Sequence, residues 1–530
     1  MRRGLILVLL VMAAATLALR AADKPNLSGR WQLGDQYLDI DHRDPILIIQ
    51  SGVSTRFLAT DGVARTDTTR TVTRWNGQAI EVRTTTEPAG VERLELSADG
   101  TRLALTAGGT TRNWQRADLR AGVASVDVTP SAFLPMYGYA NRKCGPANGV
   151  HDPLMAKVVV LESGPVRVAI VAMDLGSFVS PRLVTELRQT FGLDAVLLSA
   201  THTHSAPQFV PSSSAPTSQL GATPDGGAVY LAELERKITD AVRRASAAMF
   251  GARLHTGRGE IALGYNRLLP REHGRSRALF DNLERRPLGP LDSEFQLLEV
   301  RDEANTPRAV LVHYGVHSVV LGPTNCKYSA DYPGAMQAVI EKAIPGVQAM
   351  FIQGGAGDVN PIFQGRTGRE EEDFALVARM GDLLAAEVLK SRATLRAIPA
   401  PSLPIRARSD LLTFADRWDS ARRHELGIAT VSIGREIAIA TLPGEPLHRL
   451  QTRWKQEADA AFPLLYGYTY AAGGVWAGYL PDIRSAAQGG YGADSTSTRV
   501  EVGVGERLIE RHLVHLYDLL GMWRAAPGPS

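Results

Sequence analysis

The sequence predicts an α/β (α+β) protein, in which a large domain with a mixed sheet is preceded by a small antiparallel all-β domain. Up to about Arg116, short alternating segments are separated by turn signals. From about Gly122, apolar strands alternate with amphipathic helices. With 530 residues, of which 44% are hydrophobic and 21% are charged, the chain can bury a large core and form two or three structural units.

The small β domain is predicted from two hairpins. In each hairpin, a turn dipeptide separates two alternating segments: Asn76-Gly77 in the first and Asp99-Gly100 in the second. Such dipeptides suit type I′ turns, because both central residues need a positive φ. We therefore expect an antiparallel domain over residues 23–117, with no catalytic cluster and with His42 on its surface.

The larger domain is expected over residues 118–525. Continuous runs of Val, Ile, Ala and Leu are typical of strands covered on both faces, and they occur at 166–176, 194–201, 308–315, 346–355 and 436–444. Amphipathic segments predict helices at 181–191, 229–250, 373–391 and 507–523. The alternation of the two indicates an α/β domain with a mixed sheet.

The N-terminus has the segment order of a secretory signal. Arg2 and Arg3 precede an apolar run at 5–19, and small residues follow at 21–22. We expect residues 1–22 to be a signal peptide and the mature protein to be periplasmic or secreted, without a transmembrane span. The alternative is a single membrane anchor, but the run is short for a span and nothing resembling a stop-transfer signal follows.

Net charge and cysteine content limit the binding partners and metal sites that the sequence predicts. The formal net charge is +3, and no segment interleaves basic and aromatic residues, so nucleic acid is not an expected partner. The two cysteines, Cys144 and Cys326, could pair or stay free in an exported protein. Neither has a second cysteine or a histidine at zinc-finger spacing.

Polar side chains with metal-binding capacity follow three of the apolar strands. His202 and His204 follow the first, His317 the second and Glu445 the third, whereas His313 lies within its strand and is expected to be structural. We expect these strands to deliver their side chains to the same edge of one sheet, where two imidazoles and a carboxylate form the ligand set of many catalytic zinc sites. Taken singly, each motif also fits hydrogen-bonded loop histidines or a carboxylate that caps the next helix.

A glycine-rich loop, FIQGGAGDVNP, follows a further strand and contains Asp358 and Asn360. The loop lacks the Gly-Lys-Ser/Thr ending of a phosphate-binding loop and the spacing of a dinucleotide fingerprint, so no nucleotide site is predicted. The Gly-x-Ser-x-Gly elbow of serine hydrolases is also absent from the sequence. The glycines indicate a close approach of the backbone to another group, with Asp358 fixing the loop.

Ordered motifs between Gly122 and Trp523 resemble the neutral ceramidase family, the zinc-dependent amidases that split ceramide into sphingosine and a fatty acid. The motifs are MYGYA with NGVHDPL, SATHTHSAP, GYNR, YGVHSVVLG, GGAGDVNP, LPGEP and GYLPDIRSAAQGGYGA. The resemblance implies a zinc ion bound by His202, His317, Glu445 and Tyr479. It also implies amide hydrolysis by zinc-activated water.

The resemblance assigns further site residues. His204 matches a family histidine that faces the substrate beside the metal, and Tyr491 matches a second family tyrosine that would stabilise the oxyanion together with His204. Arg267 matches a substrate-contacting arginine, and Gly138 lies in the loop that lines the head-group pocket. These matches imply His204 and Tyr491 as catalytic residues, and Arg267 and Gly138 as substrate-binding residues. We expect Asn360, which stands at a further catalytic position of the family, to be the third catalytic residue.

Two departures from the family pattern limit this inference. Asn360 occupies the position of a family serine that is needed for activity, and an amide can orient a substrate or donate to an oxyanion but cannot act as a nucleophile. We also expect the chain to lack the C-terminal immunoglobulin-like domain of the ceramidases. Both departures bear on how a lipid would be presented to the site.

The sequence therefore predicts a zinc-dependent amidohydrolase that acts on ceramide-like or other N-acylated substrates and is able to contact membrane lipid peripherally. One alternative is a zinc hydrolase of the same fold with a non-lipid amide or ester substrate. Another is a binding protein that retains the metal without turnover. Asn360 favours the alternatives, whereas the complete ligand set favours turnover.

Overall fold

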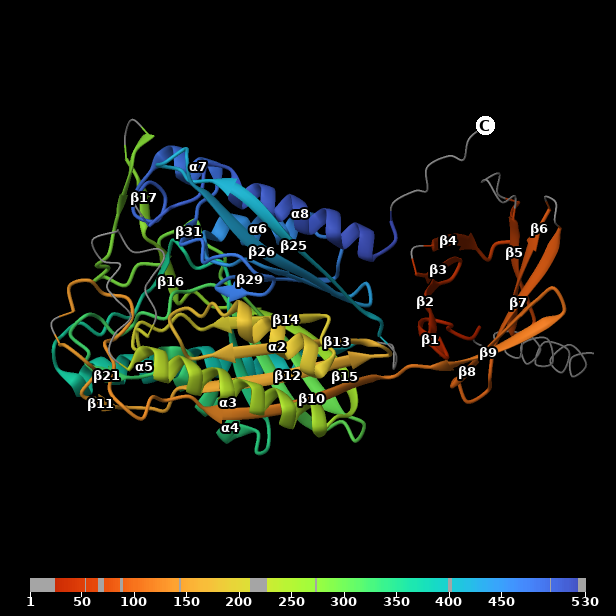
Figure 1. Ribbon diagram of the computed structural model, residues 1–530, viewed down its shortest axis with the longest axis horizontal. Helices are drawn as coiled ribbons and strands as arrows, with labels where there is room; N and C mark the ends of the chain where they lie inside the picture. Colours follow the sequence, from red (N-terminus) through yellow and green to blue (C-terminus); the bar gives the residue numbers. More distant parts are fainter. Residues whose placement is uncertain are drawn as a thin grey trace, which may run out of the picture. The chain divides into compact units, whose positions relative to one another are not determined.

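The computed structural model describes residues 24–52, 54–64, 71–85, 89–142, 144–209, 226–271, 274–398, 403–495 and 497–522. The chain divides into a first compact unit that ends at Ala117 and a second that spans Asp118–Trp523. Figure 1 shows the two units in the colours of the sequence. The expected signal peptide, residues 1–22, lies outside the described residues.

The first unit is an antiparallel sheet with the strand order β4-β3-β2-β1-β9-β8-β7-β6-β5. Both expected hairpins form, since β5 pairs with β6 and β7 pairs with β8. The expected type I′ conformation of the Asn-Gly and Asp-Gly dipeptides is wrong, because Gly77 and Gly100 have positive φ values of 63° and 70° whereas Asn76 and Asp99 do not have a positive φ. The strands are β1 (Gly29–Leu33), β2 (Gln36–Arg43), β3 (Ile46–Ser51), β4 (Ser54–Ala59), β5 (Thr71–Asn76), β6 (Ala79–Thr84), β7 (Gly90–Leu96), β8 (Arg102–Ala107) and β9 (Thr110–Arg116).

The expectation of a surface position for His42 is wrong. The side chain lies in β2, paired with Leu47 of β3, and only 5% of the residue is exposed. Its Nδ1 accepts a hydrogen bond from the backbone N–H of Leu27 at 3.3 Å. This histidine belongs to the interior of the first unit, because strand alternation points it inward.

The second unit contains a large mixed sheet with the order β22-β20-β19-β15-β10-β12-β13-β14-β30, and β24 pairs with β15. Pairs β13–β14 and β20–β22 are parallel, so the predicted mixed sheet is present. The strands are β10 (Leu119–Asp127), β12 (Met155–Ser163), β13 (Val166–Met173), β14 (Ala195–Ala200), β15 (Phe250–Glu260), β19 (Glu294–Asp302), β20 (Pro307–Tyr314), β22 (Gln348–Gln353), β24 (Arg396–Ala397) and β30 (Thr469–Tyr470).

A second sheet of four strands has the order β25-β26-β27-β29. Its strands are β25 (Ile405–Ala415), β26 (Arg423–Ile433), β27 (Ile437–Thr441) and β29 (Phe462–Tyr466). Short two-stranded pairs complete the second unit: β11 (Gly149–Val150) with β21 (Lys327–Tyr328), β16 (Gly264–Asn266) with β23 (Val359–Pro361), β17 (Leu268–Pro270) with β18 (Ser276–Ala278), and β28 (Glu445–Pro446) with β31 (Tyr479–Leu480).

The two sheets of the second unit pack face to face. One buried cluster contains Leu197 and Leu311 of the large sheet together with Val431, Ile439 and Leu464 of the small sheet. The outer faces of both sheets carry helices, as Figure 1 shows. The helices are α2 (Pro181–Phe191), α3 (Gly227–Ala247), α4 (Asp331–Ala343), α5 (Glu370–Ser391), α6 (His448–Glu457), α7 (Ile483–Gln488) and α8 (Val504–Leu519).

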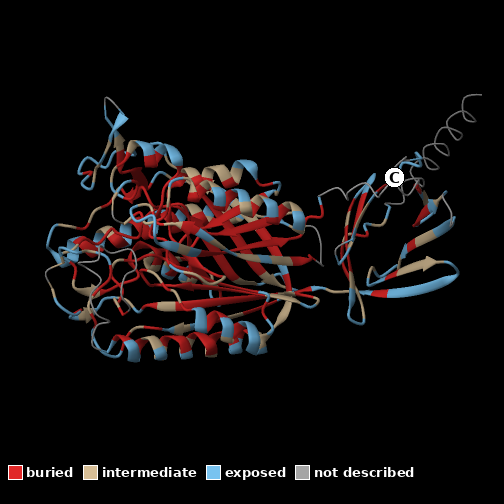
Figure 2. Ribbon diagram, turned by 45° about the horizontal axis from the view of Figure 1, so that its top comes forward, coloured by how far each residue is buried: buried red, intermediate tan, exposed pale blue. Residues whose placement is uncertain are grey.

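The helices bury one face each, which makes the second unit a four-layer α-β-β-α structure. Residues of α2 and α3 share a core with β12–β14, those of α4 and α5 with β20 and β22, and those of α6 and α8 with β26 and β27. Figure 2 shows the same pattern, with buried inner faces and exposed outer faces. None of the helices among the described residues is long and apolar enough to cross a membrane.

Helix α2 illustrates how local sequence fixes an element. The side chain of Ser180 accepts a hydrogen bond from the N–H of Leu183, and Pro181 occupies the first turn. Gly192 ends the helix with a φ of 62°. The helix occupies the predicted segment, because both of its end signals are encoded in adjacent residues.

Candidate metal centre

His202 lies just past the end of β14 in an uncommon backbone conformation. Its φ is 63°, and its N–H donates to the carbonyl of Leu175. The side-chain Nδ1 lies 2.5 Å from the carbonyl oxygen of Gly176, so this nitrogen carries the proton. The other ring nitrogen, Nε2, is therefore an unprotonated donor of a lone pair.

His317 follows β20 and is held in the same way. Its Nδ1 lies 2.5 Å from the carbonyl oxygen of Ala356 in the glycine-rich loop. Burial lowers the pKa of His317 to about 4, which keeps the imidazole neutral near pH 7. An Nδ1–H···O=C bond that fixes the tautomer and orientation of a histidine is typical of metal ligands.

Glu445 faces both of these histidines. Its Oε2 lies 3.3 Å from Nε2 of His202 and 3.2 Å from Nε2 of His317. The expectation that all three side chains leave one sheet is wrong, because β27, which precedes Glu445, belongs to the small sheet. The two stacked sheets bring their strand ends together, so the site lies where they meet.

His204 completes the buried cluster. Its Nε2 lies 3.2 Å from Nε2 of His202, and the ligand atoms of His202, His204 and His317 all lie within 4.8 Å of one another. Burial, reinforced by the neighbouring histidines, lowers the pKa of His204 well below its usual value. The cluster thus combines three imidazoles with a carboxylate.

This donor set fits a zinc ion. Nε2 of His317 and Oε2 of Glu445 are buried and have no hydrogen-bond partner among the described residues. Unpaired buried donors and acceptors are costly, and a cation between them would satisfy both. Imidazole nitrogens and a carboxylate oxygen are ligands that Zn²⁺ accepts.

Tyr479 lies beside Glu445 through backbone pairing. The short strands β28 and β31 are parallel, with Glu445 opposite Tyr479 in the register. The tyrosine is 5% exposed, and burial raises the pKa of its hydroxyl well above the usual value. Its ring centroid lies 5.5 Å from that of Tyr491.

Arg267 is buried beside these tyrosines. Its Nη1 donates to Oδ1 of Asn360 at 3.1 Å, and its Nη2 donates to the carbonyl of Gly357 at 2.6 Å. The guanidinium carbon lies 5.3 Å and 5.2 Å from the ring centroids of Tyr479 and Tyr491. The structure therefore brings Arg267, Asn360, Tyr479 and Tyr491 together.

The glycine-rich loop is fixed by Asp358, as expected. Its Oδ1 accepts from the N–H of His448, while its Oδ2 contacts Nδ1 of His448 at 2.7 Å and accepts from Nδ2 of Asn266 at 2.9 Å. A Cβ added at Gly357 would lie 2.6 Å from the carbonyl oxygen of Glu445. The loop thus needs its glycine to approach the glutamate strand.

Gly138 lies directly against His204. It has a φ of 102°, and an added Cβ would lie 2.3 Å from Nδ1 of His204. Farther along the same loop, Nη2 of Arg142 donates to the carbonyl of His204 at 2.7 Å. A disulfide between Cys144 and Cys326 joins this loop to the segment after His317.

Sequence reasoning missed the groups that hold the ligands. The carbonyls of Gly176 and Ala356 orient His202 and His317, yet backbone atoms leave no residue-type signal. Arg142 was also missed, because its contact with His204 spans 62 positions. Tyr468 was missed as well, although its ring centroid lies 4.4 Å from that of His202. It lies in none of the recognised motifs, so the sequence did not distinguish it from an ordinary core tyrosine.

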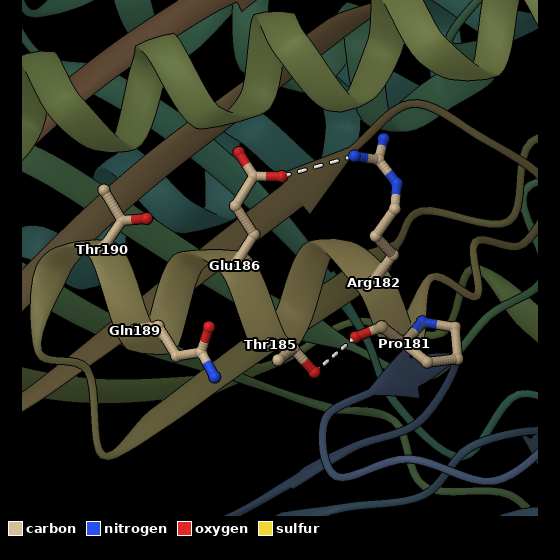
Figure 3. A pocket seen from close by; sticks show the side chains of 6 residues that line it. All are labelled: Pro181, Arg182, Thr185, Glu186, Gln189 and Thr190. Carbon is tan, nitrogen blue, oxygen red and sulfur yellow. Dashed lines mark hydrogen bonds and ion pairs between the residues drawn. The ribbon is translucent and has the colours of Figure 1, made fainter.

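A separate open cavity of about 440 Å³ lies on α2, away from this centre. Figure 3 shows its lining, with Arg182 paired to Glu186 and the hydroxyl of Thr185 donating to the carbonyl of Pro181. These are ordinary contacts within a helix. The cavity holds no cluster of ionisable side chains comparable to the one around Glu445.

Comparisons with known proteins found similar sequences and similar folds. Residues 119–376 match the family described as neutral/alkaline non-lysosomal ceramidase, N-terminal. Neutral ceramidase A of Dictyostelium discoideum is 26% identical over 275 residues, which cover 47% of this chain and 37% of that protein. The matched part thus spans little more than a third of that relative.

Two solved structures share the fold. A ceramidase complexed with C2 has a TM-score of 0.62, and the neutral ceramidase from Pseudomonas aeruginosa has a TM-score of 0.60. Each is 17% identical, and each match covers 78% of this chain and 77% of the other. The chain is thus similar to the neutral/alkaline non-lysosomal ceramidase family in the sequence of residues 119–376, and it shares the fold of the two solved ceramidase structures.

Proposed function

We propose that this chain is a zinc-dependent hydrolase that cleaves the amide bond of ceramide-like or other N-acylated substrates. The observation that carries the proposal is the convergence of His202 and His317, each fixed through Nδ1, on one oxygen of Glu445. The names of the related proteins, neutral ceramidase A and a ceramidase complexed with C2, support the choice of an amide-linked lipid.

The residues that would hold zinc are His202, His317, Glu445 and Tyr479. When bound, zinc would supply Lewis-acid chemistry that lowers the pKa of a water molecule toward neutrality, so that the deprotonated water can attack an acyl carbon. The chain's own contribution is to keep His317 neutral through burial and to fix the orientation of both imidazoles through backbone carbonyls.

The neighbouring side chains would bind and orient the acyl group. His204 and Tyr491 flank the centre and would donate to the acyl oxygen as it gains negative charge. Asn360 is oriented by Arg267, which donates to its Oδ1, so the amide nitrogen is the group that it can offer to a substrate. Gly138 would form the wall beside His204, where no larger side chain fits.

Asn360 also supports a second candidate, a zinc hydrolase of the same fold with a non-lipid amide or ester substrate. The amide cannot replace the nucleophilic character of a serine hydroxyl, and its contact with Arg267 makes the site more polar than a hydroxyl would. A binding protein that retains the metal without turnover is the remaining alternative.

A substrate panel distinguishes these functions. Zinc-loaded protein would be assayed with a short-chain fluorescent ceramide, with N-acyl amino acids and with esters of matching acyl length. We expect the highest kcat/KM for the ceramide. Preference for another amide or an ester would favour the second candidate, and the absence of turnover on all three with zinc bound would favour a binding protein.

We also propose that the protein is exported and meets its substrate at a lipid surface without spanning it. The order of segments at the N-terminus supports export, as does the disulfide between Cys144 and Cys326, because disulfides persist in oxidising compartments. Fractionation of the producing cells, with immunodetection of the mature chain, would test this location.

A further inference from the structure

Tyr468 occupies the junction of the loops that carry the metal ligands. Its N–H donates to the carbonyl of Gly444, next to Glu445, and its carbonyl accepts from the N–H of Ala200, at the end of the strand before His202. Its φ is 54°, a left-handed value that is uncommon for a residue with a side chain. The surrounding backbone therefore fixes Tyr468 in a strained conformation beside the site.

The ring of Tyr468 packs on both proposed histidine ligands. Its centroid lies 4.4 Å from that of His202 and 5.9 Å from that of His317. The residue is 1% exposed. The ring thus forms part of the wall of the metal centre.

The hydroxyl of Tyr468 is buried and has no hydrogen-bond partner among the described residues. The ring that carries this hydroxyl lies against His202 and His317, so the hydroxyl belongs to the surroundings of the candidate metal centre. A tyrosine hydroxyl ordinarily has a pKa of about 10, so it is a proton donor at neutral pH.

An unpaired buried hydroxyl and a left-handed backbone both cost free energy in the unliganded protein. Tyr470, two positions along, shows the ordinary alternative, because its hydroxyl donates to the carbonyl of Gly474. A donor kept unpaired at a site that binds an acyl group is arranged for a partner that arrives with the ligand.

We propose that Tyr468 is a further catalytic residue, whose hydroxyl donates a hydrogen bond to the acyl oxygen of the substrate as that oxygen becomes an anion. The role rests on the proposed function. The hydroxyl keeps its proton throughout, so no bond to Tyr468 forms or breaks. No motif of the family resemblance contributes this residue.

The test compares Tyr468→Phe with the control Tyr470→Phe in zinc-loaded protein. The probe is octylphosphonate, whose tetrahedral anionic head resembles the hydrolytic intermediate, and octanoate serves as the planar comparison. Affinity is measured by calorimetry, zinc content by mass spectrometry and folding by thermal unfolding. Turnover of the best substrate gives kcat and KM separately.

We expect Tyr468→Phe to weaken phosphonate binding by about tenfold or more, and octanoate binding less. Zinc content and melting temperature should stay at the wild-type values, kcat should fall, KM should change little, and Tyr470→Phe should behave as the wild type. Unchanged phosphonate affinity in Tyr468→Phe would overturn the proposal, and so would loss of zinc, since the residue would then serve the metal. If the wild type turned over no amide or ester while Tyr468→Phe still weakened phosphonate binding, the proposed function would fail and the anion-binding role would stand.

Discussion

The direction of each imidazole at this centre is decided by one backbone atom. Gly176 and Ala356 accept the Nδ1 protons of His202 and His317, and only then do both Nε2 atoms face Glu445. A second arrangement of the rings would bury unpaired donors, which is costly. Two backbone carbonyls thus hold the proposed ligands in an arrangement that suits a metal ion.

Removal of a ligand should remove the metal. We expect about one zinc per chain in the wild type and a loss of 10-fold or more in affinity in His202→Ala and Glu445→Ala. Zinc would be measured by mass spectrometry after dialysis against a weak chelator. His151→Ala, at a half-exposed position, is the control. Full zinc content in both ligand variants would show that the site lies elsewhere.

The residue at position 360 should set substrate preference. Asn360→Ser restores the hydroxyl of the family pattern and removes the amide that Arg267 now contacts. We expect kcat/KM for short-chain ceramide to rise several-fold relative to N-acyl amino acids. A drop in kcat/KM for all substrates would instead show that Asn360 serves mainly to hold Arg267 in place.

At the scale of the secondary-structure elements, loops fix the positions of the side chains at the site. The loop of Gly138 approaches His204 from one side, and the turn before β30 approaches His202 from the other. Both approaches use left-handed backbone and close contacts that few side chains tolerate. The strands place the ligands within reach, and the loops define the space that remains.

Gly138→Ala should impair activity more than stability. The new Cβ would meet Nδ1 of His204 at 2.3 Å and would strain the backbone, whose φ is 102°. We expect kcat/KM to fall by at least tenfold, with a stability loss of about 1–3 kcal/mol. Gly145→Ala, in the same loop with no atom within 4 Å of an added Cβ, is the matched control. Equal activity of the two variants would contradict this account of the contact.

At the scale of the whole molecule, the disulfide closes a loop of 182 positions around the site. Chain-entropy arguments give such a crosslink a stabilisation of about 3–5 kcal/mol. We expect Cys144→Ser with Cys326→Ser to lower the melting temperature measurably, and the wild-type mass to increase by that of two hydrogen atoms on reduction. An unchanged mass after reduction would show that both thiols are free.

Asp174 should make the stability of the second unit depend on pH. Burial raises its pKa from 3.8 to about 7, so the folded state favours the protonated carboxyl. The contribution of Asp174 to stability is therefore greatest below about pH 4 and falls as the pH rises toward 7, because only the unfolded state ionises readily there.

Asp174→Asn should remove this dependence. We expect the variant to be roughly 2–4 kcal/mol more stable than the wild type at pH 8 and close to it at pH 4, by chemical denaturation at both values. Asp240→Asn, on the exposed face of α3, should show no such difference. A variant that is less stable at pH 8 would mean that the ionised carboxylate is required by Lys157.

The sequence by itself determined much of this protein. The helix at 181–191, both hairpins of the first unit and the position of His202, His317 and Glu445 after apolar strands follow from local periodicity and end signals. These features depend on neighbours within a few positions, and for that reason they are visible in the order of residues.

Only the tertiary structure decided how those parts meet. It placed Glu445 after a strand of the second sheet, and it buried His42. It also paired Asp358 with His448 across 90 positions and packed Tyr468 against the proposed ligands. Each of these outcomes depends on packing between distant segments and on backbone atoms that every residue carries. No local pattern encodes such contacts, so the sequence could name the proposed ligands but not the groups that hold them in place.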